Sequence, residues 1–240
     1  MSPGVSSYPE YGGFDLKNST ARTGGASGAR IARFYDRVAP VYGFWSQLFE
    51  SGAARRALEA ARLSGTEAVL EVAVGGGEFH SSLARMSGLR HCVGTDLSAR
   101  MLARARRRLE LDGIEKYALC RADAHSLPFG ASTFDVLFNL YMLDLLSIED
   151  VPYVLREFAR VLRPGGRLVV VTMAEQVRLV NALWMRLYRC LPVLVGGCRP
   201  LPIAEMLASN RWKIELREQI SQCGFRSDLF VAQFAKVGVP

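Results

Sequence analysis

The sequence predicts an α/β fold, in which a sheet of seven mostly parallel strands carries helices on both faces. Two observations lead to this prediction. Short apolar segments alternate with segments of helical periodicity along most of the chain, an order typical of a doubly wound sheet. The apolar segment 69–74 also stops at three consecutive glycines, and a segment of helical spacing follows. A strand, a glycine turn and a helix in this order favour a nucleotide-like ligand.

Each expected element has a local signal. The strands are short apolar runs that often end on a polar residue, and they are expected at 69–74, 90–96, 117–123, 134–140, 167–173, 212–220 and 230–237. The helices have apolar residues three and four apart, and they are expected at 31–45 with a break at Pro40, 53–63, 78–86, 98–109, 148–162 and 176–191. Ser98 is the expected cap of its helix, and Pro164 with Gly165 ends another.

The composition bounds the class of protein. With 240 residues and 50% hydrophobic composition, the chain is expected to form one globular core at 64–240, preceded by an aromatic-rich helical segment at 28–63 and a flexible tail at 1–27. The sequence lacks a long uncharged apolar run and a secretory signal, so a cytoplasmic location is expected. The five cysteines are scattered, and they predict neither a disulfide framework nor a metal site.

The glycine turn narrows the choice of ligand. A dinucleotide turn needs Gly-x-Gly-x-x-Gly/Ala. If the pattern is started at Gly75, its last position is His80, and if it is started at Ala73, its last position is Glu78, so the pattern fails in both registers. A phosphate-binding Gly-Lys-Ser/Thr sequence is absent as well. The remaining pattern is acid-x-Ala-x-Gly-x-Gly at 71–77. It resembles motif I of the class I S-adenosylmethionine-dependent methyltransferases, with Ala73 where that family usually has glycine.

Further motifs extend this resemblance from about residue 31 to the C-terminus. Segments 94–102, 122–129 and 162–168 are similar to the family's motifs at the second, third and fifth strands. The pattern Tyr35-Asp36-x-x-Ala39-x-x-Tyr42 is similar to the N-terminal lid of the quinone-biosynthesis and phospholipid N-methyltransferase branches. The resemblance implies a Rossmann-like fold, a lid at 28–63 and S-adenosylmethionine as the cofactor.

The expected cofactor site lies at one edge of the sheet, because ligands of parallel sheets bind beyond the carboxyl ends of the strands. Glycines let the methionyl part approach the backbone, Asp96 can accept from both ribose hydroxyls, and Asp123 can accept from the adenine amine. Leu97 and Met101 can cover the adenine. The residues expected to bind the cofactor are Tyr35, Tyr42, Glu71, Ala73, Gly75, Gly77, Asp96, Leu97, Met101, Asp123, Ala124 and Asn139.

Methyl transfer from a sulfonium is an in-line displacement by an already activated donor. The protein therefore mainly has to align donor and acceptor, which is worth up to about 7–11 kcal/mol of barrier. A general base is needed only for an acceptor that begins protonated. Tyr141 and Asp144, beyond the fourth strand, are candidates for this base, and so are His80 and His125. The place of His125 beside Asp123 favours a wall of the cofactor pocket instead.

The net charge of +7 raises the question of a nucleic-acid acceptor. The position where base-amine methyltransferases have Asn/Asp-Pro-Pro-aromatic reads Asn139-Leu140-Tyr141-Met142, and a Pro-Cys nucleophile is absent. The arginines of 100–108 lack interleaved aromatics. We therefore expect a small, apolar acceptor of quinol or lipid type and no nucleic acid. Segment 177–195 combines arginines with an apolar face, which predicts a pocket wall or a peripheral membrane contact.

Two alternatives stay open. The chain could bind S-adenosylmethionine as a regulator without turnover. It could also methylate a thiol or metalloid acceptor, since Cys190, Cys198 and Cys223 fall in one region of the chain. The sequence leaves the methylated atom and the oligomeric state open.

Overall fold

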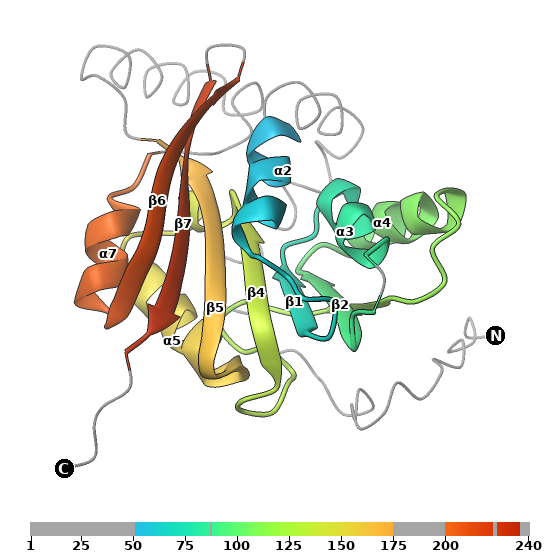
Figure 1. Ribbon diagram of the computed structural model, residues 1–240, viewed down its shortest axis with the longest axis horizontal. Helices are drawn as coiled ribbons and strands as arrows, with labels where there is room; N and C mark the ends of the chain where they lie inside the picture. Colours follow the sequence, from blue (N-terminus) through green and yellow to red (C-terminus); the bar gives the residue numbers. More distant parts are fainter. Residues whose placement is uncertain (1–50, 87, 175–199, 223–224, 236–240) are drawn as a thin grey trace.

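The computed structural model describes residues 51–86, 88–174, 200–222 and 225–235, and these form one seven-stranded sheet with helices on both faces (Figure 1). The strands are β1 (Ala68–Val72), β2 (His91–Asp96), β3 (Ala118–Arg121), β4 (Phe134–Leu140), β5 (Leu162–Met173), β6 (Trp212–Gln222) and β7 (Phe225–Phe234). They lie in the order β3-β2-β1-β4-β5-β7-β6. The pairs from β3 to β5 are parallel, while β7 runs antiparallel to both β5 and β6. The predicted fold class is confirmed.

Helices cover both faces of this sheet. Their bounds are α2 (Ser51–Ala60), α3 (Glu78–Ala84), α4 (Ala99–Leu111), the 3-10 turn η2 (Leu143–Leu145), α5 (Val151–Val161) and α7 (Ile203–Ser209). The two faces carry separate apolar clusters: α2 and α3 pack on one, and α5 and α7 on the other. Helix α7 was not predicted, because its seven residues are too few to show a helical period. None of the helices in the described ranges has the length and apolar character needed to span a bilayer.

Strand β1 lies in the middle of the sheet and is buried on both sides. All five of its residues are buried. Leu70 and Val72 contact the cluster under α5, while Val69 contacts the cluster under α2 and α3. Because a buried strand has no freedom to shift register, its end is a fixed platform for the glycine turn that follows.

The C-terminal hairpin differs from the prediction at its boundaries. Strand β7 begins at Phe225, five residues before the expected start, because Ser227 and Asp228 are buried strand residues. They pair with Met173 and Thr172 of β5, and the Asp228 carboxylate contacts the Arg217 guanidinium at 3.1 Å. Pairing of these buried polar residues with β5, which is far away in the sequence, has no local signal.

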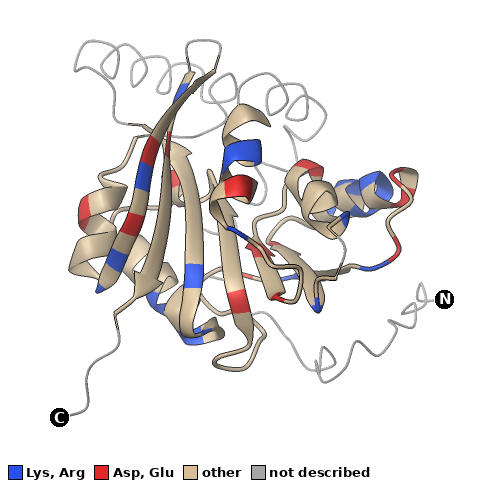
Figure 2. Ribbon diagram, viewed as in Figure 1, with Lys and Arg blue, Asp and Glu red and all other residues tan. Residues whose placement is uncertain are grey.

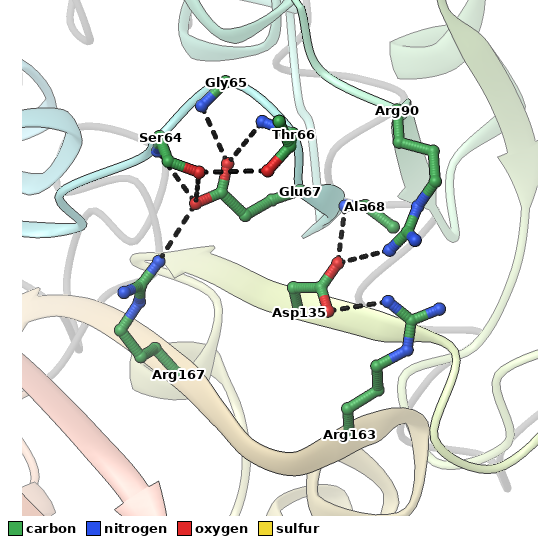
Figure 3. A network of polar contacts seen from close by, with 9 residues as sticks. All are labelled: Ser64, Gly65, Thr66, Glu67, Ala68, Arg90, Asp135, Arg163 and Arg167. Atoms are coloured by element: carbon green, nitrogen blue, oxygen red, sulfur yellow. Dashed lines mark hydrogen bonds and ion pairs between the residues drawn. The ribbon is translucent and has the colours of Figure 1, made fainter.

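Ion pairs close the amino ends of the parallel strands (Figure 3). The Asp135 carboxylate of β4 accepts a hydrogen bond from the Ala68 N–H at 2.8 Å and contacts Arg90 and Arg163, each at 2.6 Å. Beside it the Glu67 carboxylate accepts from three main-chain N–H groups of the preceding turn. Charged groups at this end of the sheet are thus satisfied within the protein.

Candidate active site

The glycine turn at the end of β1 has an unusual backbone. Ala73, Gly75 and Gly77 all have positive φ, at 69°, 52° and 86°. The N–H groups of Ala73 and Val74 both donate to the Thr95 carbonyl of β2, at 2.8 and 2.9 Å. Positive φ costs a residue with a side chain about 1–2 kcal/mol, so these bonds to β2 hold Ala73 in place.

Gly77 brings the turn against helix α4. It lies at the start of α3, and a Cβ atom at this position would lie 2.7 Å from the Ala105 Cα of α4. Such a distance is shorter than real contacts allow. The glycine is therefore required by the close approach of α4 as well as by its φ angle.

Asp96 joins the turn to the end of β2. Its carboxylate accepts hydrogen bonds from the Gly75 N–H at 2.9 Å and from the Ser98 N–H at 2.8 Å. Burial raises the pKa of this carboxyl to about 6. Leu97 follows it half-buried, and Met101 is buried in the first turn of α4, where its N–H donates to the Ser98 hydroxyl. The structure thus brings the predicted Asp96 to the glycine turn.

Asn139 is a buried polar residue near the end of β4. Its side-chain N–H donates to the Val72 carbonyl at 3.0 Å, next to the glycine turn. The side chain is fully buried, and its Oδ1 has no hydrogen-bond partner within the described ranges. An unpaired buried acceptor costs about 1–3 kcal/mol. A donor group of a ligand in this position would remove that cost.

Asp123 and His125 form a pair beyond β3. The buried Asp123 carboxylate accepts from the His125 N–H at 2.9 Å and contacts the His125 Nδ1 at 2.7 Å. The hydrogen bond to Asp123 raises the pKa of His125. Ala124 is half-buried between them and packs on the core under α5.

Glu71 contacts His80, which the sequence offered only as a candidate base. Its carboxylate lies 2.9 Å from the His80 Nδ1, and both side chains are buried. On the other side of the ring, the His80 Nε2 lies 3.8 Å from the Cys92 sulfur. Burial raises the pKa of Glu71; it opposes protonation of His80 too, but contacts with Cys92 and Glu71 raise that pKa. Glu71 and His80 bracket the glycine turn, so their contact ties its two ends together.

Comparison with known proteins agrees with this geometry. A family model described as a methyltransferase domain matches residues 69–166. The chain is 34% identical over 160 residues to the ubiquinone/menaquinone biosynthesis C-methyltransferase UbiE of Syntrophotalea carbinolica, a match that covers 65% of each protein. It is also 34% identical over 168 residues to the demethylmenaquinone methyltransferase of Thermus thermophilus, covering 68% of this chain and 75% of that protein. The chain belongs to the class I S-adenosylmethionine-dependent methyltransferases.

The fold of this methyltransferase is that of solved relatives as well. A crystal structure of an S-adenosylmethionine-dependent methyltransferase from Aquifex aeolicus superimposes with a TM-score of 0.60 at 16% identity, covering 86% of this chain and 98% of that one. S-adenosylmethionine is the cofactor, and the described residues fit it. The turn offers three consecutive glycines, Asp96 offers a carboxylate, and Asn139 offers an unpaired acceptor.

The other three candidate bases of the methyltransferase have different surroundings. The Tyr141 hydroxyl is buried at 2.7 Å from the Ser227 hydroxyl of β7. The Asp144 carboxylate is buried and accepts from the Met173 N–H of β5 at 2.7 Å. His125 keeps 29% of its side chain exposed beside Asp123. Tyr141 and Asp144 thus join β4 and η2 to the end of β5 and to β7.

Some predicted parts of the site lie outside the described residues. These are Tyr35, Tyr42, the tail at 1–27, the helix at 176–191, the segment 177–195 of the membrane contact and the three cysteines of the thiol alternative, so these predictions stay untested. From the expected lid, α2 is described, and it packs on β5, β6 and β7. The sequence analysis missed the role of His80. The signal that could have revealed this role is Glu71, an acid within an apolar strand, because a buried acid needs a partner.

Proposed function

We propose that this methyltransferase transfers a methyl group from S-adenosylmethionine to a ring carbon of a small aromatic acceptor of quinol type. The similarity to proteins named as quinone-biosynthesis methyltransferases carries this proposal. The two matches cover about two thirds and three quarters of those proteins. An electron-rich quinol ring is a carbon nucleophile, and its apolar tail suits the predicted apolar acceptor.

The residues at the carboxyl edge of the sheet hold the cofactor in this proposal. When bound, S-adenosylmethionine supplies a methyl group activated by the positive sulfonium. Asp96 accepts from the ribose hydroxyls, Asn139 Oδ1 accepts from a cofactor donor, and Asp123 accepts from the adenine amine. Glu71 acts indirectly, by holding α3 and the glycine turn through His80. The main task of these residues is to fix the donor, which is the positioning effect that dominates such displacements.

We infer that positioning, and not a dedicated base, carries the catalysis. Tyr141 and Asp144 are committed to contacts with β7 and β5, and they shape the acceptor side of the site. The His125 Nδ1 is committed to the Asp123 carboxylate at 2.7 Å, and this hydrogen bond raises the pKa of His125. His125→Ala is therefore expected to lower kcat less than tenfold, whereas loss of an essential base usually costs 10²–10⁴-fold.

The test is a methylation assay with the full chain. Demethylmenaquinol, a phospholipid amine and a small thiol serve as acceptors, and S-adenosylhomocysteine release and product mass are measured. The proposal predicts turnover with the quinol, an acid-stable methyl group on the ring, and loss of turnover in Asp96→Asn. The matched control Glu110→Gln, on the exposed face of α4, should keep it.

Other results would contradict the proposal in distinct ways. Turnover with the thiol alone would favour the thiol or metalloid alternative. Tight binding of S-adenosylmethionine without turnover on any acceptor would favour a regulator that lacks transferase activity.

A further inference from the structure

His125 contacts the carboxylate of Asp123 through two donors. Its main-chain N–H lies 2.9 Å and its ring Nδ1 2.7 Å from the same carboxylate oxygen, Oδ1. An ionised carboxylate only accepts hydrogen bonds, so Nδ1 is a donor here. The torsion that rotates an aspartate carboxylate has broad minima. Two donors that converge on one oxygen therefore help to set the plane of this carboxylate.

The main chain around this pair is held by other contacts. The Ser126 N–H donates to the Asp123 carbonyl at 3.0 Å. From α5, the Glu157 carboxylate accepts from the Leu127 N–H at 2.7 Å, and the Arg160 guanidinium donates to the carbonyl of the same leucine at 3.1 Å. The imidazole ring beside Asp123 is partly exposed. Loss of this ring should therefore leave the segment in place and change mainly the carboxylate.

The pair lies at the same edge of the sheet as Asp96. The Ala122 N–H donates to the Asp96 carbonyl at 3.1 Å, and the Arg121 guanidinium donates to the Leu97 carbonyl at 2.9 Å. Asp123 follows directly in the chain, and its side chain is buried. The cross-link between the ends of β2 and β3 thus places a second buried carboxylate beside the part of the site that contains Asp96.

Histidine is an uncommon partner for an acid in this protein. Arginine makes most of the ion pairs between described residues, and Figure 2 shows Lys and Arg along α4 and both signs of charge along β6. The fork of a guanidinium often takes both carboxylate oxygens, whereas the two His125 donors meet Oδ1 alone. On the other side of the ring, Nε2 lies 3.8 Å from the Asp150 carboxylate. The imidazole is thus held between two acids.

We propose that His125 is a positioning residue that makes this methyltransferase selective for the adenine base of its cofactor. Its ring holds the Asp123 carboxylate in the orientation that accepts from the 6-amino group of adenine. A purine with a 6-oxo group would bring an acceptor against this acceptor, so the site rejects it. The inference rests on the proposed role of Asp123 in binding the cofactor, and it adds the residue that sets the selectivity.

The test compares two variants of the full chain that differ in one hydrogen-bond donor. His125→Asn keeps a nitrogen on Cγ, in the place of Nδ1, whereas His125→Leu has a methyl group there. Calorimetry measures the Kd of S-adenosylhomocysteine and that of its 6-oxo analogue, S-inosylhomocysteine. The ratio of the inosyl to the adenosyl constant should fall at least about tenfold in His125→Leu and stay within about threefold of the wild type in His125→Asn. The Tm should be similar in all three proteins.

The variant Asp123→Asn separates the possible reasons for failure. An amide can donate as well as accept, so this variant should lose the selectivity if Asp123 faces the base. Selectivity that is lost in Asp123→Asn but unchanged in His125→Leu would refute the role of His125 alone. Unchanged selectivity in both variants would refute the proposed role of Asp123 as well.

Equal losses of selectivity in His125→Leu and His125→Asn would also overturn the inference, because they would show that the donor at Nδ1 is not what matters. The binding assay contains no acceptor. Selectivity that depends on the donor would therefore stand even if quinol methylation failed, and quinol methylation would stand if the selectivity did not depend on His125.

Discussion

At the scale of single residues, Asp96 connects the parts of the cofactor site. Its two carboxylate oxygens accept from the glycine turn and from the start of α4. The same burial that positions the carboxyl also raises its pKa to about 6. Its charge state can therefore change within the range of pH in which the protein is studied.

This pKa predicts that binding of S-adenosylmethionine depends on pH. The ionised carboxylate accepts from ribose hydroxyls, so affinity should be constant above pH 6 and fall about tenfold per pH unit below it. The free energy of unfolding should change in the opposite direction from the affinity and rise as the pH falls. A raised pKa in the folded state means that protonation favours folding, so the Asp96 contribution grows as the pH falls through 6 towards 3.8, its ordinary value. Calorimetric titration at several pH values measures the affinity. A profile that stays flat through pH 6 in the wild type, or an unchanged slope in Asp96→Asn, would contradict the prediction.

The buried Glu71–His80 contact predicts a non-additive effect on stability. His80→Leu leaves a buried carboxyl without its partner and should lower the free energy of unfolding by about 3–5 kcal/mol. The double variant Glu71→Leu/His80→Leu removes both groups and should lose less than the sum of the two single variants. Urea denaturation measures all three. Additive losses would show that the two side chains do not act as a pair.

Some contacts among the candidate site residues could be expected from the sequence, and others could not, for a physical reason. Asp96 ends β2 and Asp123 lies two residues beyond the end of β3. Parallel strands bring their ends to one edge, so this placement follows from the order of elements. The order of elements does not predict that His80 is the partner of Glu71, because the His80 side chain could point in several directions from α3. The unpaired Oδ1 of Asn139 is likewise visible only in three dimensions.

At the scale of elements, the glycine turn and α4 depend on each other. Gly77 and Gly113 provide a matched pair, since both have positive φ, at 86° and 69°. A Cβ atom at Gly77 would collide with Ala105, whereas nothing lies within 4 Å of one at Gly113.

We therefore expect two different costs from the same substitution. Gly113→Ala should lower the free energy of unfolding by about 1–2 kcal/mol, the cost of positive φ alone. Gly77→Ala should lose about 1–3 kcal/mol more from the forced separation of the turn and α4, and it should also weaken cofactor binding. Thermal unfolding and calorimetry measure the two effects. Equal losses in both variants would show that the close approach is not needed.

Element boundaries were predicted less well than element types. The segment 162–166 was expected to end a helix and turn, but it belongs to β5, which begins at Leu162. Strand β7 also begins before its apolar run. In both places backbone pairing with a neighbouring strand extends the strand beyond its apolar residues, and the local sequence carries no record of that partner.

At the scale of the whole molecule, the two ends of the parallel strands have different roles. At the amino ends, Arg90 and Arg163 satisfy Asp135 (Figure 3). At the carboxyl ends, the backbone of the glycine turn is strained and Asn139 retains an unpaired acceptor. The polarity of the sheet was predictable from the alternation of strands and helices. The insertion of β7 between β5 and β6 was not, because antiparallel pairing at the C-terminus has no separate sequence signal.

A crystal structure of the full chain with S-adenosylhomocysteine tests the central claim most directly. The account predicts the nucleoside at the carboxyl ends of β1, β2 and β4, with ribose hydroxyls within hydrogen-bond distance of the Asp96 carboxylate and a donor group at the Asn139 Oδ1. Density for the nucleoside elsewhere, or an Asp96 carboxylate that makes no contact with it, would contradict the account.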